Sequence, residues 1–257
     1  MQPSLASIEQ LALAATVGAA SGAIGAFILL RRMALVSDAL SHVALPGIAL
    51  ALAYHVDPLW GIIVTLLAAA ALVWWLESKS NLPTEALVGL LFTASLAIGI
   101  LAIPDTEILE SLFGAFPLLS SLEFAWIIAA AVLALACIFF FARSFLYRIV
   151  SGELAQSDGI GRCYDLVLLI LFSIVVALGI KIVGTLLMGA LTIIPAAIAR
   201  NLSDSMKKYM LAAAGLGAFI SMVGASLAKL SDIRPGPLII LLGVALFVLS
   251  LLAARRR

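Results

Sequence analysis

The sequence predicts an all-α polytopic membrane protein with about nine transmembrane helices. Of its 257 residues, 64% are hydrophobic and only 11% are charged, and the mean hydropathy is +1.23. Soluble domains average about 45–50% apolar and about 25% charged residues. The apolar residues gather in runs of about 20, the length that a helix needs to cross a bilayer. The connections are too short for another folded domain, so residues 1–257 are expected to form a single transmembrane domain.

Nine apolar runs account for the expected helices, and charged residues separate most of them. In chain order the runs cover residues 11–30, 36–55, 60–76, 86–103, 124–142, 164–180, 182–199, 209–228 and 237–253. Basic residues follow the first, third and fifth runs, whereas acidic residues follow the second and fourth. The sixth and seventh runs are nearly continuous. Lys181 and Gly184 mark either a tight turn or a broken helix between them.

The distribution of Lys and Arg predicts the orientation of the chain. Twelve of the fifteen basic residues fall in one set of alternate connections or at the C-terminus. Cytoplasmic loops are enriched in such residues, so we expect a cytoplasmic C-terminus and, with nine spans, an N-terminus outside. The three basic residues on the other side are Lys181, Lys229 and Arg234.

Asp38 and His42 are ionisable residues in an otherwise almost entirely apolar segment. Their spacing of four places both side chains on one helix face, with Cβ atoms roughly 5–6 Å apart. Ionisable groups within a membrane helix are costly and are functional candidates by default. A carboxylate and an imidazole also suit a divalent transition metal. The alternative is a polar pair satisfied by its neighbours. Pro46 and Gly47 follow, where the helix is expected to loosen.

Two other regions contain candidate residues, each with an ordinary alternative explanation. His55 precedes Asp57 at the outer end of the second run and is a weaker candidate for metal uptake, because interfacial histidines are usually just solvated. The polar segment 151–160 is the longest connection on the basic side, and taken alone it is only a polar loop.

Several classes of function are excluded or made less probable by what the sequence lacks. There is no Walker A motif, so ATP is not bound by that route. No His-Glu-x-x-His or Gly-x-Ser-x-Gly sequence occurs, so the chain is not expected to be a hydrolase. The net charge of +1 gives no indication of nucleic-acid binding. We expect no permanently bound cofactor.

Several segments, taken in order, resemble the membrane permease of bacterial ATP-binding-cassette (ABC) importers for zinc, manganese and iron. The first is Asp38-Ala39-Leu40-Ser41-His42 after a basic pair and before Gly47. The second is the stretch 184–200, which contains Ile-Ile-Pro-Ala-Ala-Ile-Ala-Arg. Residues 112–114 and the turn at 232–237 also match. The resemblance extends over essentially the whole chain.

The resemblance implies an architecture related to the cobalamin and siderophore permeases, in a bacterial cell membrane. It implies a second permease copy, expected as a homodimer, with ATPase subunits in the cytoplasm and an extracellular metal-binding protein. Asp38 and His42 then correspond to the intramembrane metal ligands. Glu153, Ala155 and Gly159 correspond to the segment that packs on the ATPase. Two copies facing each other would supply two carboxylates and two imidazoles, a set that suits zinc or manganese.

Two rival classes remain open from the sequence alone. A secondary transporter driven by an ion gradient would usually carry more intramembrane acids, and Asp38 is the only clear one. A membrane metalloenzyme needs three protein ligands and an open position, whereas the chain supplies two convincing ligands.

Overall fold

The computed structural model describes residues 5–80, 82–102, 112 and 120–254, and every regular element within them is a helix. Of the motif at 112–114, residues 113 and 114 lie outside the described residues. The helices are α1 (Leu5–Leu30), α2 (Ala34–His42), α3 (Leu45–Ala53), α4 (Pro58–Lys79), α5 (Thr84–Ala102), α7 (Ser121–Val150), α8 (Gly152–Ser157), α9 (Cys163–Val183), α10 (Met188–Leu202), α11 (Met206–Ser231) and α12 (Pro235–Ala254).

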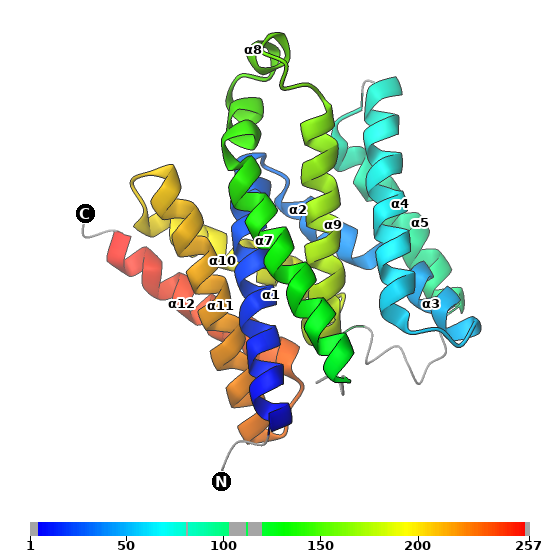
Figure 1. The fold of residues 1–257 in the computed structure, drawn as a ribbon, viewed down its shortest axis with the longest axis vertical. Coiled ribbons are helices and arrows are strands. Elements are labelled where there is room, and N and C mark those ends of the chain that lie inside the picture. Colours follow the sequence, from blue (N-terminus) through cyan, green and yellow to red (C-terminus); the bar gives the residue numbers. More distant parts are fainter. Residues whose placement is uncertain (1–4, 81, 103–111, 113–119, 255–257) are drawn as a thin grey trace.

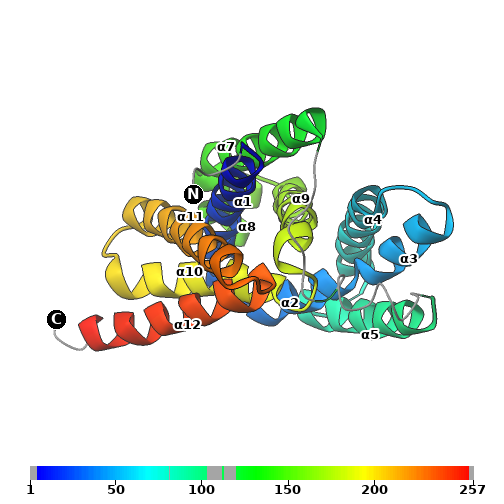
Figure 2. The same cartoon turned by 90° about the horizontal axis from the view of Figure 1, so that it is seen from below.

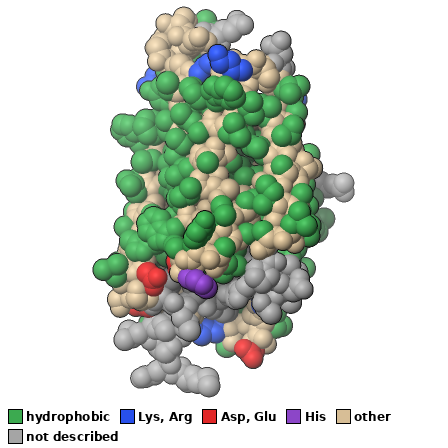
Figure 3. All heavy atoms as spheres, turned by 90° about the vertical axis from the view of Figure 1, so that its right-hand side faces the viewer, with side chains coloured by type: hydrophobic (Ala, Val, Ile, Leu, Met, Phe, Trp, Pro, Cys, Tyr) green, Lys and Arg blue, Asp and Glu red, His purple; other side chains and the backbone are tan. Residues whose placement is uncertain are grey.

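Most of the described chain has the length and composition of membrane spans. Eight segments are long and apolar enough to cross a bilayer, and α10, at 15 residues, is a shorter apolar helix. One face of the molecule shows a broad belt of hydrophobic side chains, with charged side chains toward its two ends (Figure 3). The expected all-α polytopic membrane fold is confirmed.

Helices α1 and α9 form the centre of the bundle. Both are largely buried, and α1 packs against α7, α9, α10 and α11. Seen along the bundle, α7 lies on one side, while α2, α5 and α12 lie along the opposite edge (Figure 2). The short helix α8 lies at one end of the bundle and the start of α1 at the other (Figure 1).

The second span is two helices rather than one. Val43 and Ala44 donate their N–H groups to carbonyls three residues back, at 3.1 and 3.4 Å, and a new helix begins at Leu45. Pro46 explains the break, since it has no N–H to donate to the carbonyl of His42 and its ring crowds that turn. His42 is therefore the last residue of α2.

The chain turns sharply between the sixth and seventh runs. Of the two alternatives that the sequence left open, a tight turn or a broken helix, the structure shows the turn. Helix α9 ends at Val183, and Gly184 has φ +86°, a conformation that glycine adopts readily and other residues do not. Helix α10 then begins only at Met188. The expected span 182–199 was thus wrong at its start, because residues 184–187 form the turn.

Helix α7 is longer than the sequence suggested. It continues to Val150, eight residues past the expected end at 142. The added turns carry Arg143, Tyr147 and Arg148 between apolar residues. The mean hydropathy of these turns is therefore lower than that of a membrane span, although they are helical. This extension brings Arg148 and α8 to the end of the bundle.

Candidate functional site

Helix α2 carries both Asp38 and His42 and places them in different environments. The Asp38 side chain is exposed on this chain, whereas His42 is 6% exposed. The carboxylate is still near enough to interact electrostatically with the imidazole. The pair therefore places one candidate ligand at the protein surface and one just inside it.

His42 packs in an apolar setting that leaves part of its ring unsatisfied. Its imidazole meets the ring of Phe92 from α5 edge to face, with centroids 5.3 Å apart. The buried Nδ1 atom has no hydrogen-bond partner within the described part of the chain. A buried polar atom without a partner leaves about 1–3 kcal/mol of desolvation uncompensated. A bound ion or water at that nitrogen would recover it.

Helix α10 fixes the position of α2 through a glycine. A Cβ atom added at Gly189 would lie 2.7 Å from the Cα atom of Asp38 and 2.9 Å from its backbone nitrogen. Such distances are shorter than any real contact between these atoms, so only glycine permits this approach. The backbone that carries Asp38 thus rests directly on the first turn of α10.

Ser41 links the same helix to the turn before α10. Its hydroxyl lies 2.7 Å from the carbonyl oxygen of Asp38 and 2.7 Å from that of Thr185. Ser41 and Thr185 are both fully buried. The stretch 184–200, one of the segments that resemble the permease family, therefore supports the Asp38–His42 helix from one side.

The described residues of one chain hold too few ligands for a complete metal site. They contain no group of three or more His, Cys, Asp or Glu side chains that could bind an ion together. Next to Asp38, Ser37 adds a buried hydroxyl that has no hydrogen-bond partner among the residues the structure describes. With a carboxylate and an imidazole, a chain provides half of a four-ligand set.

His55 lies apart from this pair. It sits in the connection between α3 and α4, exposed, with φ +55°. Thirteen residues of mostly helical chain separate it from His42, or roughly 20 Å at 1.5 Å per residue. Nearby, Asp57 caps α4 and accepts a hydrogen bond from Lys181 at 3.0 Å. A role for His55 in metal uptake stays a prediction.

The segment 151–160 contains the short helix α8, which ends in a Schellman motif. The N–H of Ile160 donates to the Ala155 carbonyl at 2.8 Å, and that of Gly159 donates to Gln156 at 3.3 Å. Gly159 has the required positive φ of +82°. Ala155 is fully buried, whereas the side chain of Glu153 lies outside the described part of the structure. The segment is thus an ordered helix and turn.

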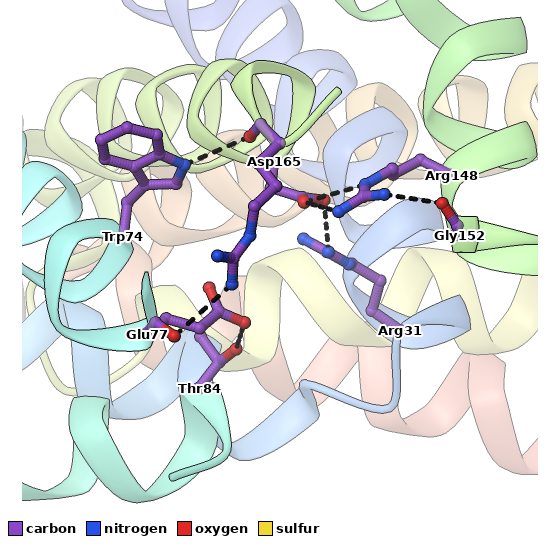
Figure 4. Close-up of polar contacts among 8 residues, drawn as sticks. Arg31, Trp74, Glu77, Thr84, Arg148, Gly152 and Asp165 are labelled. Atoms are coloured by element: carbon purple, nitrogen blue, oxygen red, sulfur yellow. Dashed lines mark hydrogen bonds and ion pairs between the residues drawn. The ribbon is translucent and has the colours of Figure 1, made fainter. Parts of the chain in front are cut away.

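A buried carboxylate that the sequence analysis did not single out ties α8 to the bundle. Asp165 of α9 is 8% exposed and forms ion pairs with Arg31 at the end of α1 and with Arg148 of α7, the latter at 2.9 Å. Arg148 also donates to the carbonyl of Gly152 in α8 at 2.8 Å. Figure 4 shows these contacts meeting at Asp165.

A second set of contacts at the same end joins α4 to the residue before α9 and to the start of α5. The indole N–H of Trp74 donates to the backbone carbonyl of Arg162 at 3.2 Å, and Thr84 donates to Glu77 at 2.8 Å. The sequence did carry one signal for this network. Asp165 is an acid at the start of an apolar run, on the side that carries twelve of the fifteen basic residues. An acid in that position indicates a basic partner.

Two curated proteins resemble this chain over nearly its whole length. The manganese import system permease protein ScaB of Streptococcus parasanguinis is 31% identical over 249 residues, covering 95% of this chain and 89% of ScaB. The high-affinity zinc uptake system membrane protein ZnuB of Haemophilus influenzae is 32% identical over 240 residues, covering 91% of this chain and 92% of ZnuB.

Solved structures show the same arrangement of helices. A chain of PsaBC from Streptococcus pneumoniae, solved in complex with Fab, superposes with a TM-score of 0.84 at 29% identity, covering 97% of this chain and 92% of that one. An inward-facing putative metal-chelate type ABC transporter gives a TM-score of 0.78 at 22% identity, which supports the fold alone.

The family model described as the ABC 3 transport family matches residues 6–254, nearly the whole chain. Together with the relatives that share about 30% identity over most of their length, this match establishes that the chain belongs to the ABC 3 transport family.

Proposed function

We propose that this chain is the membrane-spanning permease subunit of an ABC importer for a divalent transition metal. Manganese and zinc are the primary candidates, because relatives at about 30% identity are named for the import of one or the other. Iron is a further candidate. ATP hydrolysis is assigned to a separate subunit, in agreement with the absence of a Walker A motif.

The observation that carries the proposal is the Asp38–His42 pair on α2. The pair combines an exposed carboxylate with a buried imidazole whose Nδ1 atom has no partner among the described residues. One chain is then an incomplete ligand set. Two copies related by a two-fold axis, with their α2 helices facing each other, would complete a site of two carboxylates and two imidazoles. Such a site opens and closes as the copies move.

We assign α8 and the turn at Gly159 to docking of the ATPase. The segment lies at one end of the bundle (Figure 1) and is held by Arg148, which also binds Asp165. Movement imposed on α8 would therefore reach α9 and the end of α1, from which α2 begins. On this assignment α8 faces the cytoplasm, and the metal-binding protein docks at the opposite end.

Transport by the reconstituted complex tests this function. The permease is placed in proteoliposomes with the ATPase and metal-binding protein of the same system, and uptake of manganese, zinc and iron is measured. We expect uptake of one or more of these metals that requires ATP and all three components. Uptake that persists without the ATPase and follows an imposed proton gradient would instead identify a secondary transporter.

A further inference from the structure

A lateral cavity of about 560 Å³ opens between α7 and α11. It is lined by α7 between Phe139 and Leu146 and by the first turns of α11 between Met206 and Leu211. This volume lies within the roughly 300–1,000 Å³ of typical ligand sites. Apart from two cations, every side chain that lines it is apolar, and Phe140 is 80% exposed at its edge.

The two cations are Arg143 and Lys207, one from each helix. Both side chains are exposed, and neither makes an ion pair or hydrogen bond with another described residue. No acidic residue lines the cavity. The cavity therefore joins an apolar groove to two positive charges, with no carboxylate among its lining residues.

The position of the cations along the helices matches the level of lipid headgroups. Helix α7 has 30 residues, about 45 Å at 1.5 Å per residue, against a hydrocarbon core of about 30 Å. Arg143 lies seven residues, or about 10 Å, before its end at Val150. Lys207 lies in the first turn of α11. Both belong to the end of the bundle that the basic residues place in the cytoplasm.

The cavity also lies on the face where lipid would be expected. Viewed along the bundle, α7 and α11 lie away from the edge formed by α2 and α5 (Figure 2). Pairing of two copies through α2 would leave the cavity open to the bilayer. A groove lined by phenylalanine, leucine and methionine does not favour binding of a small anion from water, because it offers no replacement for the hydration of the anion.

We propose that this cavity binds one anionic phospholipid of the inner leaflet. An acyl chain lies in the apolar groove, and the headgroup phosphate contacts the guanidinium of Arg143 and the ammonium of Lys207. A lipid held in this way bridges α7 and α11, both of which pack on α1.

Native mass spectrometry of the purified permease complex tests the site, with phosphatidylglycerol and phosphatidylcholine of identical acyl chains as probes. For two basic contacts we expect about 5- to 30-fold tighter binding of phosphatidylglycerol to one site per permease copy. In the variant Arg143→Gln/Lys207→Gln, the affinities for phosphatidylglycerol and phosphatidylcholine should differ by no more than about twofold. Glycerol 3-phosphate, which has the headgroup charge but no acyl chain, should not compete.

A matched variant separates a defined site from general surface charge. Lys79→Gln/Lys208→Gln removes two exposed basic groups from the same end of the bundle, and neither residue lines the cavity. It should retain the preference for phosphatidylglycerol. A photoactivatable acyl chain on that lipid should crosslink within residues 139–146 or 206–211. Equal binding of both lipids, equal losses in the two double variants, or crosslinks elsewhere would overturn the proposal.

Discussion

The carboxylate of Asp165 holds three helices together at the end of the bundle that carries α8. It is mostly buried and balanced by two guanidinium groups. Removing one partner of a buried ionic cluster is costly, since the remaining charges lose their compensation. The cluster also gives Arg31 and Arg148 a structural partner, apart from the chain orientation that the basic residues predict.

Asp165→Asn should lower the stability of the permease by about 1–3 kcal/mol, because the amide keeps the shape but cannot neutralise two arginines. Thermal unfolding of the detergent-solubilised protein measures this as a lower melting temperature. Asp158→Asn is the control, since Asp158 is an exposed carboxylate that accepts a hydrogen bond from Tyr147 at 2.6 Å. Equal shifts in the two variants would show that Asp165 does not hold the helices.

At the scale of helices, the close approach of α2 and α10 determines where Asp38 lies. Gly189→Ala places a methyl group within 2.7 Å of the Asp38 Cα atom, so α2 must move. Overpacking of this kind typically costs about 1–3 kcal/mol. We expect metal uptake to fall severalfold or more while the protein still inserts into the membrane.

Gly215→Ala is the matched control for this change. Gly215 lies in α11, and a Cβ atom there would meet nothing within 4 Å. The variant should transport like the parent protein, with a small gain in helix propensity. If Gly189→Ala transports equally well, the packing of α10 does not position the metal-binding helix.

The turn that ends α8 requires glycine at position 159 because of its backbone conformation, and not because a side chain there would clash with neighbouring atoms. A Cβ atom at Gly159 would touch nothing, but its φ of +82° is strained for any other residue by about 1–2 kcal/mol. Gly159→Ala should therefore weaken copurification of the ATPase or lower ATP-driven uptake. Gly161→Ala, two residues on and equally open, should have no such effect. The same loss from both would contradict docking through this turn.

The sequence predicted the apolar segments and their order better than the number of helices or their ends. Each of the eight long segments and α10 falls on an expected apolar run, but the second run is two helices and the polar segment 151–160 contains α8. The break at Val43–Ala44 followed from Pro46, whose consequences are local. The continuation of α7 to Val150 was missed, since its last two turns contain arginines that hydropathy assigns to a loop.

The candidate site could be predicted only in part, because local sequence patterns do not show contacts between segments that lie far apart in the chain. The spacing of Asp38 and His42 is a property of one helix and is readable from the chain. Their different exposures depend on α5 and α10, which pack on α2 from elsewhere in the sequence. No local sequence pattern predicts the ring contact between Phe92 and His42, or the ion pairs that Arg31 and Arg148 both form with Asp165.

For the whole molecule, the turn at Gly184 keeps the basic connections on one side. Single cysteines at Ser205 and Ser231, both exposed in the structure, test the resulting topology after Cys137 and Cys163 are replaced. An impermeant maleimide should label Ser231→Cys in intact cells and Ser205→Cys only after permeabilisation. The reverse pattern would place the C-terminal part of the chain in the opposite orientation.

The central claim is that Asp38 and His42 contact the metal during transport, and ATP-driven uptake by single variants tests it most directly. Asp38→Asn and His42→Gln are reconstituted with the ATPase and metal-binding protein, beside Glu85→Gln, which removes an exposed carboxylate at the start of α5. Each of the first two should reduce uptake at least about tenfold with assembly intact, and the control should not. Uptake at the parental rate by both Asp38→Asn and His42→Gln would contradict the account.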